Sequence, residues 1–150
     1  MILIAHRGNI DGPIKERENT LSYIEEAHDA GYDVEIDIRL KNNKLYLGHD
    51  KAQEEVQLSW LKKRTNWLWV HCKTPETFSF FYNSQELFIH YQLNYFLHDV
   101  DQLALTSKNY IWAYPGMQPL ENSIAVLPEL HNEDVSKCIG VCSDYLLKYV

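Results

Sequence analysis

Two carboxylates alternate with apolar side chains in residues 33–40, which read DVEIDIRL. In an extended strand, Glu35 and Asp37 lie on one face, about 6–7 Å apart along the chain, and the apolar side chains lie on the other. Two carboxylates this close repel each other unless a cation or a shared proton lies between them. Hard divalent cations such as Mg²⁺ and Ca²⁺ prefer oxygen ligands of this kind. The alternative is an ordinary antiparallel strand with one solvated face.

Titratable and basic side chains stand at the ends of three other strands that the sequence predicts. They are His6 and Arg7 after residues 2–5, His49 after residues 45–47, and His71 and Lys73 at the end of residues 67–72. In a parallel α/β sheet or barrel, the carboxyl ends of the strands meet on one face, where active sites lie. We therefore expect these groups and the carboxylate pair to share one pocket.

The remaining pattern is that of short strands separated by turns or short helices. Strands rich in Ile, Val, Leu, Tyr and Trp are predicted at residues 2–5, 34–40, 45–47, 67–72, 95–98, 110–114, 123–127 and 138–143. A helix is expected over residues 20–30, with Asn19 as its N-cap and Gly31 after its last turn. Further helices are expected over residues 58–63 and from Pro75. The strand–helix–strand order near the N-terminus favours parallel pairing.

Length and charge restrict the class of protein. The 150 residues predict a single domain over residues 1–150. A net charge of −7 disfavours nucleic acid as a partner, because such binding relies on Lys and Arg. No run of about 18 apolar residues is present, so no membrane span is expected, and the apolar start is too short for a signal peptide. Three cysteines without a CxxC pair favour the reducing cytoplasm.

Four motifs in the first fifty residues follow one another in a recognisable order. They are His6-Arg7-Gly8, Glu18-Asn19-Thr20, Glu35-Ile36-Asp37 and His49-Asp50. This order resembles the glycerophosphodiester phosphodiesterase family, which belongs with the phosphatidylinositol-specific phospholipase C-like phosphodiesterases. The chain would be a short and divergent member. The triplet at residues 71–73 is similar to the family's Glu-x-Lys strand end with His71 in place of Glu, and the strands around Trp112 and at residues 140–145 resemble later strands of the family.

The resemblance implies a role for each matching residue. His6 and His49 match the acid–base pair, and Arg7 and Lys73 match groups that hold the phosphate. Glu18 matches a carboxylate beside the substrate whose role stays open. In the same way, Glu35 and Asp37 match two metal ligands, and His71, in place of the family's Glu, would be the third. Alternatively, His71 is a hydrogen-bond partner and another carboxylate, Glu18 or Asp99, completes the metal site. The expected cofactor is a divalent ion, Mg²⁺ or Ca²⁺ by resemblance, with Mn²⁺ or Zn²⁺ as the alternative because imidazole suits those ions better.

The family fold is a TIM barrel, and a (β/α)₈ barrel typically needs about 250 residues. We therefore expect an α/β, TIM-like barrel in reduced form, with few helices in its second half. A large aromatic content would help to cover the exposed strands, and formation of a homodimer would do the same.

The expected function is metal-dependent hydrolysis of a small phosphodiester, similar to a glycerophosphodiester, by His/His acid–base catalysis. Attack by a substrate hydroxyl with release of a cyclic phosphate is an open variant of this reaction, and a cyclic-diester or phosphosugar substrate is another. The alternative from a different class is a non-catalytic module that binds a phosphate ligand. The short chain and His71 favour that alternative, whereas the presence of both His6 and His49 argues against it.

Overall fold

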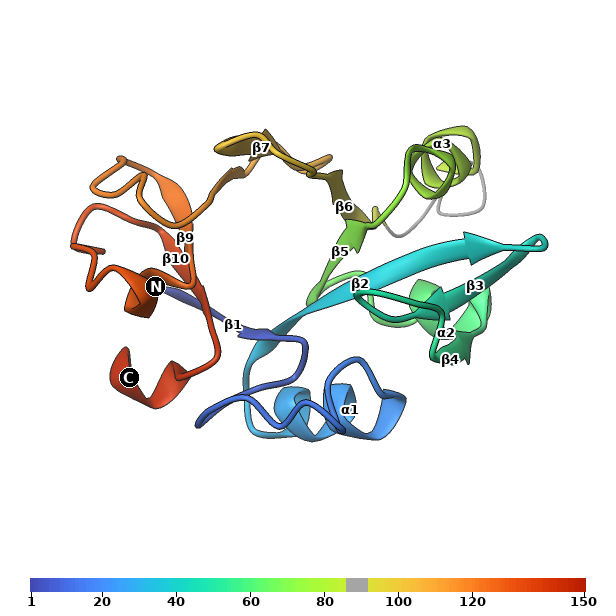
Figure 1. The fold of residues 1–150 in the computed structure, drawn as a ribbon, viewed down its shortest axis with the longest axis horizontal. Helices are drawn as coiled ribbons and strands as arrows, with labels where there is room; N and C mark the ends of the chain where they lie inside the picture. The colour runs from blue at the N-terminus through green and yellow to red at the C-terminus, as the bar shows by residue number, and fades with distance from the viewer. Residues whose placement is uncertain (86–91) are drawn as a thin grey trace.

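The computed structural model describes residues 1–85 and 92–150, and its main feature is one large mixed sheet (Figure 1). The strands are β1 (Ile2–His6), β2 (Asp33–Lys41), β3 (Lys44–Leu47), β4 (Glu54–Val56), β5 (Leu68–Cys72), β6 (Asn94–Leu97), β7 (Leu103–Leu105), β8 (Ile111–Ala113), β9 (Ser123–Val126) and β10 (Gly140–Ser143). The α-helices are α1 (Leu21–Asp29), α2 (Leu58–Lys62) and α3 (Pro75–Asn83), and short 3₁₀ helices span Pro128–Leu130 and Leu146–Lys148.

The sheet curls so that eight strands follow one another in the order β6-β5-β2-β1-β10-β9-β8-β7. Every neighbouring pair along this path is parallel except β7 with β8. The antiparallel hairpin of β3 and β4 extends the carboxyl half of β2. β6 and β7 do not pair as strands, and the turn after β7 is instead bonded to β6, with Ser107 N donating to Tyr95 O at 2.9 Å. The result is a half-barrel that is open at this side.

The expected TIM-like barrel is therefore wrong. The fold is dominated by its sheet, the sheet is mixed, and α1, α2 and α3 are the α-helices within residues 1–85 and 92–150. The connections after β7, β8 and β9 are turns, irregular loops and 3₁₀ turns, so no α-helix covers the strands there. Length explains the connection between β8 and β9, because residues 114–122 are fewer than the dozen or more that a helical crossover takes. Residues 127–139 between β9 and β10 are long enough but form loops and a 3₁₀ turn. No helix in the described part of the chain is long and apolar enough to cross a membrane.

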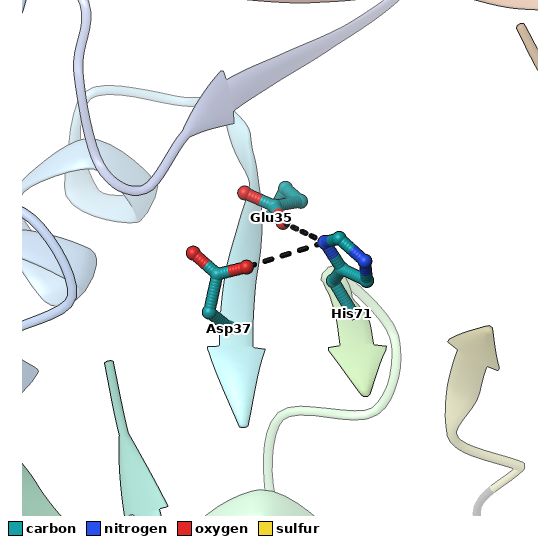
Figure 2. A group of neighbouring side chains, drawn as sticks. All are labelled: Glu35, Asp37 and His71. Carbon is teal, nitrogen blue, oxygen red and sulfur yellow. Dashed lines mark ion pairs between the residues drawn. The ribbon is translucent and has the colours of Figure 1, made fainter. Parts of the chain in front are cut away.

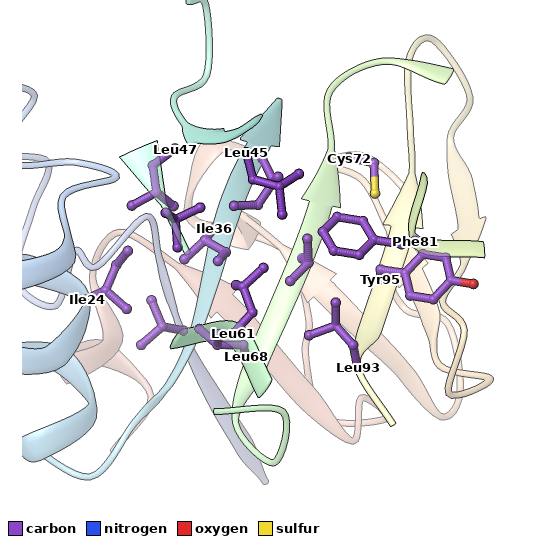
Figure 3. Close-up of a cluster of buried hydrophobic side chains, with 14 of the residues drawn as sticks. Ile24, Ile36, Leu45, Leu47, Leu61, Leu68, Cys72, Phe81, Leu93 and Tyr95 are labelled. Atoms are coloured by element: carbon purple, nitrogen blue, oxygen red, sulfur yellow. The ribbon is translucent and has the colours of Figure 1, made fainter. Parts of the chain in front are cut away.

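Two apolar clusters lie on opposite faces of the curled sheet. The outer cluster packs β2 and β5 against the helices and includes Ile24, Ile36, Leu61 and Phe81 (Figure 3). The inner cluster fills the inside of the curl with the side chains Ile4, Trp69, Phe96, Trp112, Ile124, Val126 and Cys142. The alternation of β2 directs its apolar side chains to the outer cluster, which leaves Glu35 and Asp37 on the inner face.

The start of α1 differs from the sequence prediction. Thr20, and not Asn19, is the N-cap, and its hydroxyl accepts a hydrogen bond from Tyr23 N at 3.4 Å. Asn19 instead has a positive φ of 56° and is buried, with its side chain bonded to Asp37. The helix from Pro75 begins as expected, because Thr74 caps it and proline is tolerated in the first turn.

Candidate functional site

A pocket of about 570 Å³ lies at the carboxyl ends of the parallel strands. Six of the eight residues predicted for the site line it, namely His6, Arg7, Glu35, His49, His71 and Lys73. Asp37 lies fully buried beneath them and contacts three of them. Glu18 does not line the pocket and instead lies behind Arg7. The structure therefore brings together groups that are distributed over almost half of the sequence.

Glu35, Asp37 and His71 form a compact group of possible metal ligands (Figure 2). Each is buried, and one ligand atom of each lies within 4.8 Å of the others. The parallel pairing of β2 with β5 places Asp37 opposite His71. His71 Nδ1 consequently lies 3.2 Å from Asp37 Oδ1 and 3.6 Å from Glu35 Oε1.

A backbone carbonyl determines which nitrogen of His71 faces the carboxylates. His71 Nε2 lies 3.2 Å from the carbonyl oxygen of His98, and a carbonyl can only accept, so Nε2 carries the hydrogen. In the neutral imidazole, Nδ1 then presents its lone pair toward Asp37 and Glu35. Burial by itself would lower the pKa of His71, but the two carboxylates outweigh it and raise that pKa to about 9. The arrangement attracts a cation at Nδ1, either a proton or a metal ion.

The residues present fit a divalent ion. Glu35 Oε2 is buried and has no hydrogen-bond partner among the described residues, an arrangement that is costly for a charged oxygen unless a cation is nearby. Two carboxylates and one imidazole are a donor set common to several divalent metals. A ligand histidine usually donates its other N–H to a carbonyl or carboxylate, as His71 does to His98.

Asp37 is held from several sides by polar and cationic groups. Arg7 Nε lies 3.1 Å from its Oδ2, and Lys73 Nζ lies 3.7 Å from its Oδ1. The Asn19 side chain donates to Oδ2 at 2.9 Å and accepts from the Asp37 backbone N–H at 2.9 Å. Burial by itself would raise the pKa of Asp37, but His71, Arg7 and Lys73 outweigh it and hold the pKa well below its usual range. Asp37 is thus both a candidate ligand and the centre of a buried ion-pair network.

Two histidines of the pocket have their Nδ1 atoms paired with aspartates. His6 Nδ1 lies 2.7 Å from Asp144 Oδ1, and His49 Nδ1 lies 2.7 Å from Asp50 Oδ1. Because an ionised carboxylate only accepts, each Nδ1 donates, and each Nε2 is left for chemistry. Burial by itself would lower the pKa of His6, but the hydrogen bond to Asp144 and the nearby carboxylates outweigh it, so the pKa is raised above its ordinary value. Asp144 is largely buried, whereas the side chain of Asp50 is 92% exposed.

The sequence pattern does not predict the pairing of Asp144 with His6, because the two residues are 138 positions apart. The register of β1 with β10 sets Ala5 opposite Ser143, so the next residues on the two strands become neighbours. Asn9 was also missed, and its amide donates to Asp144 at 2.8 Å and to Glu18 at 2.9 Å. Glu18 in turn accepts from Arg7 Nη1 at 3.3 Å. Glu18 therefore acts as a positioning group for Arg7.

The loop that carries His49 is held by Arg39 of β2. The guanidinium donates to the carbonyl oxygens of Gly48, at 3.1 Å from Nε, and of His49. Gly48 has a φ of 148°, and a Cβ at this position would lie 1.8 Å from the carbonyl oxygen of Lys51. The loop conformation therefore requires glycine.

We expect Gly48→Ala to displace the His49 loop. The methyl group must move the Lys51 carbonyl, so stability in urea unfolding should fall by about 1–3 kcal/mol, and any turnover that the pocket supports should fall about tenfold or more. Gly31→Ala is the matched control, because Gly31 also has a positive φ of 98° but a Cβ there meets nothing within 4 Å. Its effect should be limited to backbone strain at the end of α1, with turnover unchanged. Equal loss of turnover in the two variants would contradict this role of Gly48.

The side of the pocket opposite the charged groups is formed by later strands. Trp112 and Tyr114 line it, as do His98 and Asp99. Trp112 both packs in the inner cluster and borders the pocket. Comparisons of the chain with protein-family models, with curated proteins and with solved structures find no match.

Proposed function

We propose that this protein is a metal-dependent phosphodiesterase that acts on a small phosphodiester. The observation that supports this most directly is the convergence on one pocket of a buried Glu35–Asp37–His71 group, two histidines with available Nε2 atoms, and two cationic side chains. A phosphodiester is anionic, and its reaction requires neutralisation of the phosphate oxygens together with proton transfer to and from the two alcohol oxygens. Each of these needs has a matching group in the pocket.

In the proposed reaction, Arg7 and Lys73 bind the non-bridging phosphate oxygens. Their charges are partly offset by Asp37, which keeps both side chains directed at the same point. Glu35, Asp37 and His71 would hold the divalent ion, which when bound would neutralise charge on the phosphate. The identity of the ion is part of the proposal. The family resemblance implies Mg²⁺ or Ca²⁺, whereas an imidazole ligand favours Mn²⁺ or Zn²⁺.

His6 and His49 transfer the protons. His6, oriented by Asp144, takes a proton at Nε2 from the attacking hydroxyl or water, and His49 donates one from Nε2 to the leaving alkoxide. The burial of His6 with its paired aspartate favours His6, and not His49, as the base. A simple phosphate-binding module has no use for two such histidines.

The direct test is hydrolysis of bis(p-nitrophenyl) phosphate by metal-stripped protein. Without metal, turnover should be at background, and addition of Mg²⁺, Ca²⁺, Mn²⁺ or Zn²⁺ in turn should identify an ion that restores it. His6→Ala should then abolish the restored activity while phosphate binding is retained. Full turnover in the presence of a chelator would refute metal dependence. Phosphate binding without turnover for any ion would favour the non-catalytic alternative.

Asp144→Asn tests the orientation of His6. Because Asn can donate to Nδ1 and so select the wrong tautomer, we expect kcat to fall by about 10²–10³-fold with little change in KM. Asp50→Asn is the matched control, since the same 2.7 Å contact to His49 Nδ1 is exposed to water there. Its effect should stay below about tenfold, because exposed ion pairs contribute little. Equal effects of the two substitutions would show that Asp144 does not position the base.

The compartment is part of the same proposal. Cys72, Cys138 and Cys142 are free thiols in the structure, and unpaired cysteines are typical of proteins that work in a reducing environment. We therefore assign the activity to the cytoplasm, with a small phosphodiester as the partner. A net charge of −7 continues to disfavour a nucleic acid in that role.

A further inference from the structure

The pocket has two walls of opposite chemical character. The charged wall comes from β1, β2, β5 and the loop after β3, and it carries the groups of the proposed reaction. The other wall comes from the far side of the curl, from the ends of β6, β8 and β9. Its members are mainly apolar, and they are Leu97, Trp112, Tyr114, Val126 and Leu127, with His98 and the exposed Asp99 beside them. The ring of His98 stacks on Tyr114 with centroids 3.3 Å apart and enlarges this surface.

Leu127 adopts a backbone conformation that a leucine rarely takes. Its φ and ψ are 46° and 48°, in the left-handed region. Among the residues that the structure describes, eight that are not glycine have positive φ, and six of those are asparagine, which tolerates this region. The other two are Arg7 and Leu127, and both line the pocket. Strained residues of this kind gather at functional sites.

The loop around Leu127 is held from both sides. Its N–H donates to Cys142 O of β10 at 2.7 Å, and its carbonyl accepts from Leu130 N at 3.0 Å. Neither bond depends on the side chain, so asparagine or glycine would make both with less strain. The isobutyl group itself packs against the inner cluster and borders the pocket. What the leucine adds over asparagine at this position is apolar surface facing the pocket.

We propose that the pocket selects phosphoesters in which one ester arm is apolar, an alkyl or aryl group that lies on Leu127 and Tyr114 while the phosphate is held by Arg7 and Lys73. The proposal rests on the proposed function for the location of the phosphate. A polyol arm on Val126 and Leu127 would give up hydrogen bonds to water that these apolar side chains cannot replace. An alkyl arm gains affinity by up to about fourfold for each methylene that is buried.

The test measures the binding of four probes by titration calorimetry, with the metal ion that supports turnover or, if none does, with Mn²⁺. The probes are methyl phosphate, propyl phosphate, phenyl phosphate and glycerol phosphate. Propyl and glycerol phosphate form a matched pair, because both have a three-carbon arm and only one has hydroxyl groups. We expect propyl phosphate to bind about tenfold more tightly than methyl phosphate and more tightly than glycerol phosphate, with phenyl phosphate at least equal to propyl. Glycerol phosphate binding as tightly as propyl phosphate would overturn the proposal.

Leu127→Asn shows whether this wall is responsible. The variant retains the backbone conformation, so we expect the preference for propyl over methyl phosphate to fall at least threefold. Leu130→Asn is the matched control, because Leu130 is a 63% exposed leucine outside the pocket, and the preference should stay the same. An unchanged preference in Leu127→Asn would overturn the assignment to Leu127. The probe series on the unsubstituted protein does not depend on either variant.

Failure of the proposed function is distinguishable from failure of this inference. Selective binding of apolar phosphoesters without hydrolysis of any phosphodiester would refute the phosphodiesterase activity and support the apolar wall. Hydrolysis of phosphodiesters with no preference for apolar arms in binding would support the phosphodiesterase activity and refute the apolar wall.

Discussion

Asp37→Asn should abolish turnover and destabilise the protein at the same time. The carboxylate is fully buried and contacts Arg7, Lys73 and His71, so its loss leaves three cationic or protonated groups without their shared partner. Removal of one member of a buried ion-pair network typically costs about 3–5 kcal/mol. Turnover should fall by about 10³-fold or more, because both the metal site and the phosphate-binding side chains lose their anchor.

The measurement combines steady-state hydrolysis with urea unfolding of the same preparation. Asp29→Asn is the control for the loss of a carboxylate, since Asp29 is exposed at the end of α1 and should change stability by less than about 0.5 kcal/mol. If Asp37→Asn were as stable as the unsubstituted protein, the buried ion-pair network around Asp37 would not be what stabilises this part of the fold. From the sequence alone, this substitution would be expected to spare the fold, because it removes a charge and little volume. The three buried contacts reverse that expectation.

Glu35→Gln should differ from Asp37→Asn in its effect on stability. We expect it to lose metal binding without any loss of stability in the metal-free state. Glu35 is nearly as deeply buried as Asp37, but its Oε2 has no hydrogen-bond partner, and its one ion pair, among the described residues, is the 3.6 Å contact to His71. Neutralising an under-partnered buried charge removes a desolvation penalty, so the metal-free variant should be at least as stable as the unsubstituted protein. The loss of a carboxylate ligand should weaken metal binding by about 100-fold or more.

Unfolding with and without metal separates these two effects. At a metal concentration 100 times the Kd, the unsubstituted protein should gain about 2.7 kcal/mol of stability, and Glu35→Gln should gain little at the same concentration. Gln57→Glu, which adds a carboxylate at an exposed position before α2, is a control for a general effect of surface charge on metal-induced stability. Equal stabilisation of Glu35→Gln and the unsubstituted protein by the metal would exclude Glu35 as a ligand.

The period of two along β2 was enough to place Glu35 and Asp37 together on one face and the apolar residues on the other. This alternation is a property of the extended backbone itself, so it does not depend on what lies beside the strand. The same holds for the start of α3 at Pro75, where Thr74 and the proline act within one turn. The ends of β1 and β5 were also placed correctly to within one residue, and with them the positions of His6 and His71.

Only the tertiary structure could decide which side chains meet across the sheet and whether the sheet closes into a barrel. Asp144 reaches His6, Asn19 reaches Asp37, and His98 directs the proton of His71, and each contact depends on strand order and register that no local pattern encodes. The fold itself follows the same rule. The motifs of the first fifty residues suggested a TIM-like barrel, but those motifs mark strand ends and do not specify the crossovers that follow. In this chain the later strands are joined by loops, turns and 3₁₀ turns in place of α-helices, and the curled sheet remains an open half-barrel.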